Sequence, residues 1–154
     1  MSRYFLDSSA LVKRYLEERG TEWVLEITAA EAEHLIVVAQ IAPVEIVSAV
    51  TRRAREGVLK ARTARAARLL IDRHARQQYQ VIALTENVVR LAEDLLERHA
   101  LRASDAIQLA SALEGGDRLA FGADGRLEFV CGDARLLAAA ASEGLAAIDP
   151  NIRS

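Results

Sequence analysis

The sequence predicts an α/β fold of three layers, α/β/α, in which a mostly parallel central sheet lies between two layers of helices. Short apolar segments rich in β-branched residues alternate along the chain with longer segments of helical periodicity. Such alternation is typical of βαβ units, whose sheets are covered by helices on both faces. The 154 residues include two prolines and no low-complexity linker, which favours a single domain over residues 1–154.

The first half of the chain predicts two strands, at 3–6 and 34–39. Four helices are predicted in this half, at 8–16, 21–32, 43–56 and 60–78. Pro43 suits the first turn of the third of these helices, because its missing N–H has no partner there in any case. Gly57 ends the same helix.

The second half predicts three strands, at 79–84, 127–131 and 145–148. Helices are expected after Thr85, over 103–114 and over 134–142. Thr85 and Ser104 are suitable N-caps, since their hydroxyls can accept a bond from a backbone N–H in the first turn. The glycine-bearing segments 115–116 and 122–125 predict loops.

Charge and composition exclude several classes of protein. The chain has 20 Lys and Arg against 22 Asp and Glu, so its net charge of −2 excludes nucleic-acid binding through bulk positive charge alone. Cys131 is the one cysteine, which excludes an intramolecular disulfide and suggests a reducing compartment. No apolar run approaches the roughly 20 residues of a membrane span. We therefore expect a soluble, cytoplasmic protein with no membrane contact.

Four acids lie between apolar stretches, where an ionised carboxylate needs compensation: Asp7, Glu45, Asp105 and Asp133. Each follows a strand or begins a helix, and sites in parallel sheets form at the carboxyl ends of the strands. Mg²⁺ or Mn²⁺, which prefer hard oxygen ligands, would supply that compensation. Helix capping is the alternative for the three aspartates, and a solvated helix face is the alternative for Glu45.

The segments that hold these acids resemble the sequence blocks of the PIN-domain family, in particular the VapC-type toxins of bacterial type II toxin–antitoxin pairs. The four segments are FLDSSALVKRY, APVEIVSAV, LRASDAIQLASAL and FVCGDARLLAAAASEGLAAI. Their order and spacing agree with the family over nearly the whole chain, which implies a PIN-like fold. One position departs: Cys131 stands where the family commonly has Ser or Thr.

The resemblance implies a toxin that is a metal-dependent endoribonuclease, in which water attacks an RNA phosphodiester. Asp7 and Asp105 would be the principal ligands of Mg²⁺ or Mn²⁺. Glu45 and Asp133 would bind through water, complete a second ion or orient the attacking water. Ser9 would hold a carboxylate or a substrate oxygen. The resemblance also implies a small antitoxin protein as partner and a homodimer, with contacts from the early helices.

Arginines gather on the helix expected at 60–78, where five of them fall on one broad face: Arg62, Arg65, Arg68, Arg73 and Arg76. The opposite face is predicted to be apolar and carries Leu59, Ala66, Ala67, Leu70 and Ile71. Arginine suits phosphate because its planar fork is always charged. The arginine face therefore predicts RNA steering, with a solvated helix face or the docking of an acidic partner segment as alternatives.

Two other functions remain open at this point. One is a non-catalytic module of the same fold that binds RNA or a protein. The other is a phosphatase that uses Asp7 as a nucleophile, although such enzymes usually carry a second Asp two residues on, where this chain has Ser9.

Overall fold

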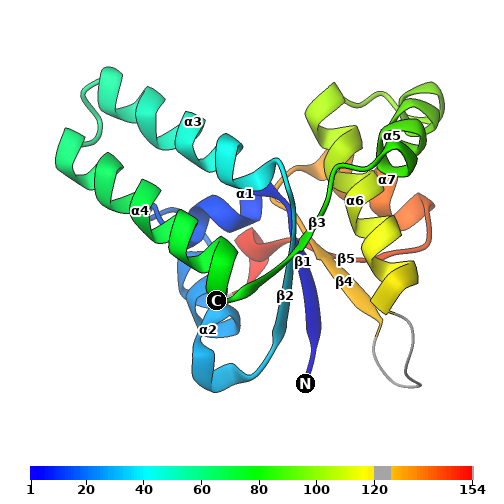
Figure 1. The fold of residues 1–154 in the computed structure, drawn as a ribbon, viewed down its shortest axis with the longest axis horizontal. Helices are drawn as coiled ribbons and strands as arrows, with labels where there is room; N and C mark the ends of the chain where they lie inside the picture. Colours follow the sequence, from blue (N-terminus) through cyan, green and yellow to red (C-terminus); the bar gives the residue numbers. More distant parts are fainter. Residues whose placement is uncertain (120–125, 154) are drawn as a thin grey trace.

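A computed structural model describes residues 1–119 and 126–153 of the chain (Figure 1). Its five strands form one sheet in the order β3-β2-β1-β4-β5, and every neighbouring pair is parallel. The strands are β1 (Arg3–Leu6), β2 (Leu35–Ala39), β3 (Tyr79–Ile82), β4 (Leu127–Val130) and β5 (Ala146–Ile148). The predicted three-layer α/β/α fold with a parallel sheet is thus confirmed.

In the described residues, seven α-helices connect and cover these strands: α1 (Ser8–Leu11), α2 (Thr21–Thr28), α3 (Ala42–Arg55), α4 (Ala61–Gln77), α5 (Glu86–Arg98), α6 (Ala103–Leu119) and α7 (Ala134–Ser142). Three 3₁₀ turns accompany them: η1 (Val12–Arg14), η2 (Ala30–Ala32) and η3 (Pro150–Ile152). Within the described parts of the chain, no helix is both long and apolar enough to cross a lipid bilayer.

The first two predicted helices are too long. The helix expected at 8–16 ends at Leu11 and continues as the tighter turn η1. The helix expected at 21–32 ends at Thr28, whose buried hydroxyl donates to the carbonyl of Val24 at 2.7 Å. Ala29 then adopts an extended conformation, so the chain resumes as η2. A hydroxyl that bonds to its own helix in this way competes with the backbone ladder.

The two faces of the sheet bury two separate apolar clusters. Phe5, Val37 and Phe129 point to the face covered by α5, α6 and α7, where the two phenylalanine rings stack at 5.6 Å. Leu6 and Val130, each the next residue along its strand, point to the face covered by α1 to α4. This alternation follows from the period of two in a strand. It explains why β2, which lies inside the sheet with helices over both faces, is an unbroken apolar run.

The chain changes direction at β1. It runs from β1 outward to β2 and β3, then crosses back to place β4 on the other side of β1. The pairing of these two central strands extends beyond the ladder, because the N–H of Asp7 donates to the carbonyl of Val130 at 3.1 Å. The carboxyl ends of β1 and β4 therefore lie at the topological switch point, where open α/β sheets bind their ligands.

Residues 115–116 do not form the predicted loop, because they lie inside α6. A Cβ on Gly115 would stand 3.2 Å from Ile82 and 3.7 Å from Val37. The helix thus approaches the sheet so closely that a Cβ at position 115 would crowd Ile82, and glycine serves packing here. Ser104 is likewise not the N-cap, because α6 begins at Ala103 and Ser104 lies one residue past the start. The predicted loop at 122–125 lies outside the described residues.

The helices α3 and α4 run side by side as a pair that extends beyond the sheet (Figure 1). Only a narrow stripe of α4 is buried, at Ala67 and Ile71. Ala66 and Leu70, which the sequence pattern places on an apolar face, are exposed, because little protein lies beyond this pair to cover them. Near its carboxyl end α4 is anchored by His74, whose Nδ1 lies 2.8 Å from the hydroxyl of Tyr15.

The two neighbouring glycines of α6 offer a paired test of close packing. We expect Gly115→Leu to lower the free energy of unfolding by about 1–3 kcal/mol, because the new side chain overpacks the sheet. We expect Gly116→Ala to raise it by up to about 1 kcal/mol, since a Cβ there meets only Leu127 at 4.0 Å. Urea unfolding of both variants measures this, and equal effects at the two positions would contradict the packing argument.

Candidate functional site

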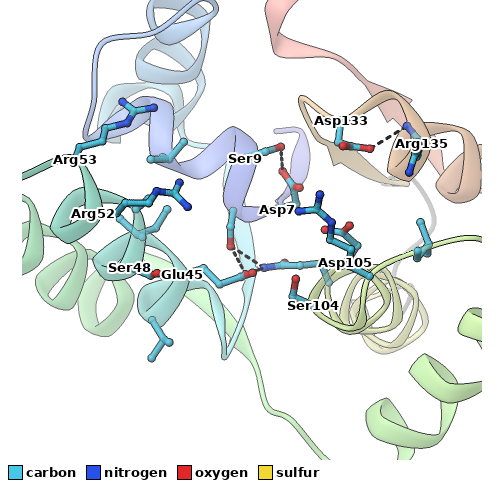
Figure 2. Close-up of a pocket in the computed structure, with 18 of the residues that line it drawn as sticks. Asp7, Ser9, Glu45, Ser48, Arg52, Arg53, Ser104, Asp105, Asp133 and Arg135 are labelled. Carbon is cyan, nitrogen blue, oxygen red and sulfur yellow. Dashed lines mark hydrogen bonds between the residues drawn. The ribbon is translucent and has the colours of Figure 1, made fainter. Parts of the chain in front are cut away.

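All four acids line one pocket of about 720 Å³ at the carboxyl ends of the strands (Figure 2). Asp7 follows β1, Glu45 lies in the first turn of α3, Asp105 lies in the first turn of α6 and Asp133 precedes α7. Ser9 also lines this pocket. In Figure 2, Asp7 lies between Glu45 on one side and Asp105 and Asp133 on the other.

Asp7 is the most deeply placed of these acids, with an exposed fraction of 4%. Its Oδ1 accepts bonds from the hydroxyl of Ser9 at 2.7 Å and from the N–H of Ala10 at 2.9 Å. The second bond caps α1, so the capping interpretation holds for this residue while it also faces the pocket. Burial raises the pKa of Asp7 to about 6. The bonds from Ser9 and Ala10 favour the ionised form and lower the pKa, but burial has the larger effect.

Ser9 joins the loops that follow the two central strands. Its hydroxyl donates to Asp7 and accepts from the N–H of Gly132 at 2.8 Å. Cys131, buried in the same loop, accepts from the N–H of Asp133 at 3.2 Å through its sulfur. Burial raises the pKa of the Cys131 thiol well above its usual range. The cysteine thus stays a neutral thiol, and its sulfur accepts the backbone N–H of Asp133 as a serine or threonine hydroxyl could.

The two acids on the α6 and α7 side are held differently. Asp133 is exposed and caps α7, with Oδ1 accepting from the N–H groups of Arg135 at 2.9 Å and Leu136 at 3.0 Å. Asp105 caps no helix, because it lies inside the first turn of α6. Partial burial raises the pKa of Asp105, and repulsion from Asp133 and Glu45 raises it further, while Arg102 opposes both.

Glu45 is held by two side chains, which the sequence analysis did not single out. Its Oε2 accepts from the hydroxyl of Ser8 at 2.5 Å and from Nε2 of Gln108 at 2.6 Å. The alternative of a solvated helix face for Glu45 does not hold, since this face lines the pocket. One signal was present: Gln108 follows Asp105 by three residues, and side chains at that spacing share a helix face.

Four arginines line the same pocket, namely Arg52, Arg53, Arg102 and Arg135. Arg53 already forms an ion pair with Glu18. The other three make no ion pair with any residue in the described parts of the chain. Arg52 could have been found by its spacing, because it lies seven residues after Glu45 and so returns to the same face of α3.

The five arginines that the sequence singled out lie elsewhere. Arg62, Arg65, Arg68, Arg73 and Arg76 are all exposed on α4, and none of them is among the described residues that line the pocket. Arg76 lies 4.0 Å from Asp72, one turn away on the same helix. The structure thus separates a set of arginines beside the acids from a second set on the neighbouring helix.

The donor set suits a hard divalent cation. Carboxylate and hydroxyl oxygens are the ligands that Mg²⁺ and Mn²⁺ prefer, and Mg²⁺ is commonly held by one or two carboxylates with retained waters. Among residues 1–119 and 126–153, no three Asp, Glu, His or Cys side chains form a ready-made cage for an ion. Burial and repulsion from Asp133 and Glu45 both raise the pKa of Asp105, and a positive charge between these acids would offset that repulsion. The residues therefore fit an ion with a partly retained water shell.

The fold and this pocket define an α/β protein whose site lies at the switch point of a parallel sheet and is lined by carboxylates. The family model of the PIN domain matches residues 4–133. The chain therefore belongs to the PIN-domain family. No curated protein is similar enough in sequence to match it.

Solved structures with the same fold agree with this assignment. A toxin–antitoxin complex from Klebsiella pneumoniae aligns with a TM-score of 0.60 and 18% identity, covering 97% of this chain and 98% of its own. VapBC2 from Rickettsia felis, bound to a DNA fragment from its promoter, aligns with a TM-score of 0.61 and 14% identity, covering 95% and 97%. FitAB bound to the IR36 DNA fragment aligns with a TM-score of 0.61 and 12% identity, covering 98% of this chain and 97% of its own.

Burial of Asp7 predicts that Asp7→Asn stabilises the metal-free protein. A rise in pKa from 3.8 to about 6 means that the folded state holds a proton which the unfolded state has released. The proton that Asp7 retains stabilises the folded state. This stabilisation is full below about pH 4 and is lost as the pH rises through about 6. The rise corresponds to about 3 kcal/mol. Asparagine keeps the acceptor oxygen and removes the charge, so the variant is expected to be more stable at about pH 8.

The measurement is urea unfolding in EDTA across this pH range. The stability gap between Asp7→Asn and the wild type should be on the order of 3 kcal/mol at about pH 8 and close to zero near pH 4. Asp117→Asn, which changes an exposed acid on α6, serves as control and should show no such gap. A less stable Asp7→Asn protein at about pH 8 would contradict the burial argument.

Proposed function

We propose that this protein is a metal-dependent endoribonuclease and the toxin of a toxin–antitoxin pair. The observation that carries the proposal is the meeting of four carboxylates, from four separate segments of a PIN-domain chain, in one pocket. Asp7 and Asp133 also cap helices, but Glu45 and Asp105 lie inside the first turns of their helices and still line the pocket. Ser9 donates to Asp7 and holds it in place, which fits a ligand better than an attacking nucleophile.

In the proposed site, Asp7 and Asp105 are the principal ligands of Mg²⁺ or Mn²⁺. Glu45 and Asp133 act through bound water or orient the attacking water. A bound ion would supply a water of lowered pKa and neutralise charge that builds up on the phosphodiester. Ser9 keeps Asp7 ionised and oriented through the bond it donates. No residue of the chain forms a covalent intermediate in this scheme.

The arginines divide into two roles in the proposal. Arg52, Arg102 and Arg135 line the pocket beside the acids, so they can hold phosphates next to the one that is cut. Arg62, Arg65, Arg68, Arg73 and Arg76 form an exposed face on α4, which would attract RNA and orient it. Planar, permanently charged guanidinium groups suit both tasks.

The proposed partners follow from the neighbours in structure, which include a toxin–antitoxin complex and two proteins bound to DNA fragments. We propose a small antitoxin protein that blocks the pocket, and a homodimer as the assembled form. An RNA substrate inside the cell places the activity in the cytoplasm.

The central test is the cleavage of a pool of structured RNA by the wild type and by Asp105→Asn. We expect the wild type to cut with Mg²⁺ or Mn²⁺ and not with EDTA. The variant should lose more than about 100-fold of the rate, since even residues outside the first coordination shell contribute about 10–100-fold. Asp117→Asn, on the exposed part of the same helix, should cut normally.

Equal cutting by the wild type and Asp105→Asn would show that the activity lies elsewhere or comes from a contaminant. RNA binding without cleavage under any metal would favour a non-catalytic module instead. The wild type and Asp105→Asn should melt at similar temperatures, which separates the loss of a metal ligand from the loss of the fold.

The α4 arginines predict a change in the salt dependence of RNA binding. Arg65→Glu combined with Arg68→Glu should weaken binding and reduce the slope of log K against log salt by about one for each phosphate that the protein no longer neutralises. Arg90→Glu combined with Arg118→Glu makes the same change in net charge on α5 and α6, and it should leave the slope unchanged. An unchanged slope in the α4 variant would remove α4 from the RNA-binding surface.

A further inference from the structure

Gln108 is a buried amide that the ligand set described above does not use. It lies on α6, lines the acidic pocket and has an exposed fraction of 1%. Its Nε2 lies 2.8 Å from the hydroxyl of Ser8 and 2.6 Å from Oε2 of Glu45. Its Oε1 is a buried polar atom with no hydrogen-bond partner, alone in this among the described residues.

An orphaned amide oxygen is a cost that the chain tolerates. A buried acceptor without a partner loses its bonds to water and gains nothing in exchange. Such groups are rare, and a catalytic or otherwise functional role is one of the few explanations for them. The other end of the amide offers a reason for keeping Gln108. Its Nε2 donates to Glu45 directly, and it also donates to Ser8, which in turn donates to Glu45.

The pattern of donors fixes which end of the amide faces Glu45. Ser8 gives its single hydroxyl proton to Oε2 of Glu45, so its oxygen is free to accept from Gln108. The reverse orientation of the amide would set its oxygen against the carboxylate at 2.6 Å. Two acceptors would then face each other in a buried place, which is strongly unfavourable.

We propose that Gln108 and Ser8 are positioning residues that fix Oε2 of Glu45 and turn its Oε1 toward the acid-lined pocket. Oε1 has no hydrogen-bond partner among the described residues, whereas Oε2 has two. Asp105 and Gln108 lie one turn apart on α6, so a single helix supplies one acid and orients another that comes from α3. This inference rests on the proposed function, because it assigns Glu45 a task in the metal site.

The test uses the full-length protein and Mn²⁺ as the probe. Gln108→Met keeps an unbranched side chain of similar size and removes the donor together with the orphaned oxygen. Ser8→Ala removes the hydroxyl, and Ser8→Thr restores it. Ser111→Ala, one turn further along α6 at a buried position outside the pocket lining, is the matched control. Calorimetry gives the Mn²⁺ affinity, RNA cleavage gives kcat and KM, and melting in EDTA gives stability.

We expect Gln108→Met to lower Mn²⁺ affinity or kcat by about 10–100-fold, the usual effect of losing a partner that orients a ligand. Its melting temperature in EDTA should be equal to or above that of the wild type, because the orphaned oxygen is removed as well. Ser8→Ala should reproduce part of the loss, Ser8→Thr should recover it, and Ser111→Ala should show none. In a Glu45→Gln background, Gln108→Met should cause no further loss, since the two positions act as a unit.

Two results would overturn the proposal. One is wild-type Mn²⁺ affinity and kcat in both Gln108→Met and Ser8→Ala. The other is an equal loss of Mn²⁺ affinity or kcat when Gln108→Met is made in the wild type and in the Glu45→Gln background. A lower melting temperature with unchanged Mn²⁺ affinity and kcat would assign Gln108 a structural role only.

The proposed function fails separately from this inference. A wild type that binds Mn²⁺ and cuts no RNA would overturn the nuclease proposal, while the variants' Mn²⁺ affinities would still decide the role of Gln108. A wild type that binds no Mn²⁺ overturns both.

Discussion

Like charges that are forced together at the switch point of the sheet set the main constraint on this structure. Burial raises the pKa of both Asp7 and Asp105, and repulsion adds to it, from Asp133 and Glu45 at Asp105 and from Asp105 at Asp7. A fold that holds such a group must restrain each carboxylate, or the side chains would turn outward to solvent. The restraints differ from acid to acid, and together they account for most of the polar contacts around the pocket.

Capping and ligand binding are not alternatives in this site. The backbone N–H groups that cap α1 and α7 bind Oδ1 of Asp7 and Oδ1 of Asp133, which fixes the direction in which each carboxylate points. Such bonds favour the ionised form while burial opposes it. For Asp7, burial has the larger effect and the pKa rises to about 6. A positive charge beside Asp7 would favour its ionised form further, and the ionised carboxylate is the form that binds a metal ion.

The sequence was sufficient for the layers, the parallel sheet and the four acids, because these depend on local signals: β-branched runs, helical periodicity and acids that follow strands. It failed where tertiary packing decides. The glycine at 115 reads as a loop in isolation, yet it lies in a helix that presses against Ile82. Leu70 reads as core, yet α4 extends past the sheet and leaves it exposed. Gln108 reads as one polar residue in an alanine-rich helix, and only the fold places it 2.6 Å from Glu45, 63 positions earlier in the chain.

In the proposed function, the distribution of charge around the pocket lets a protein of net charge −2 accept a polyanion. Acids alone would repel a phosphodiester, and arginines alone would bind it without cutting. Here Arg52, Arg102 and Arg135 lie among the lining residues with the acids, while the α4 arginines lie farther out on an exposed helix. Interactions between exposed charges fade over about 8–10 Å at physiological salt. In the proposed function, the outer set attracts RNA to the molecule, and the inner set, which lines the pocket, offsets the charge of the acids once a phosphate enters.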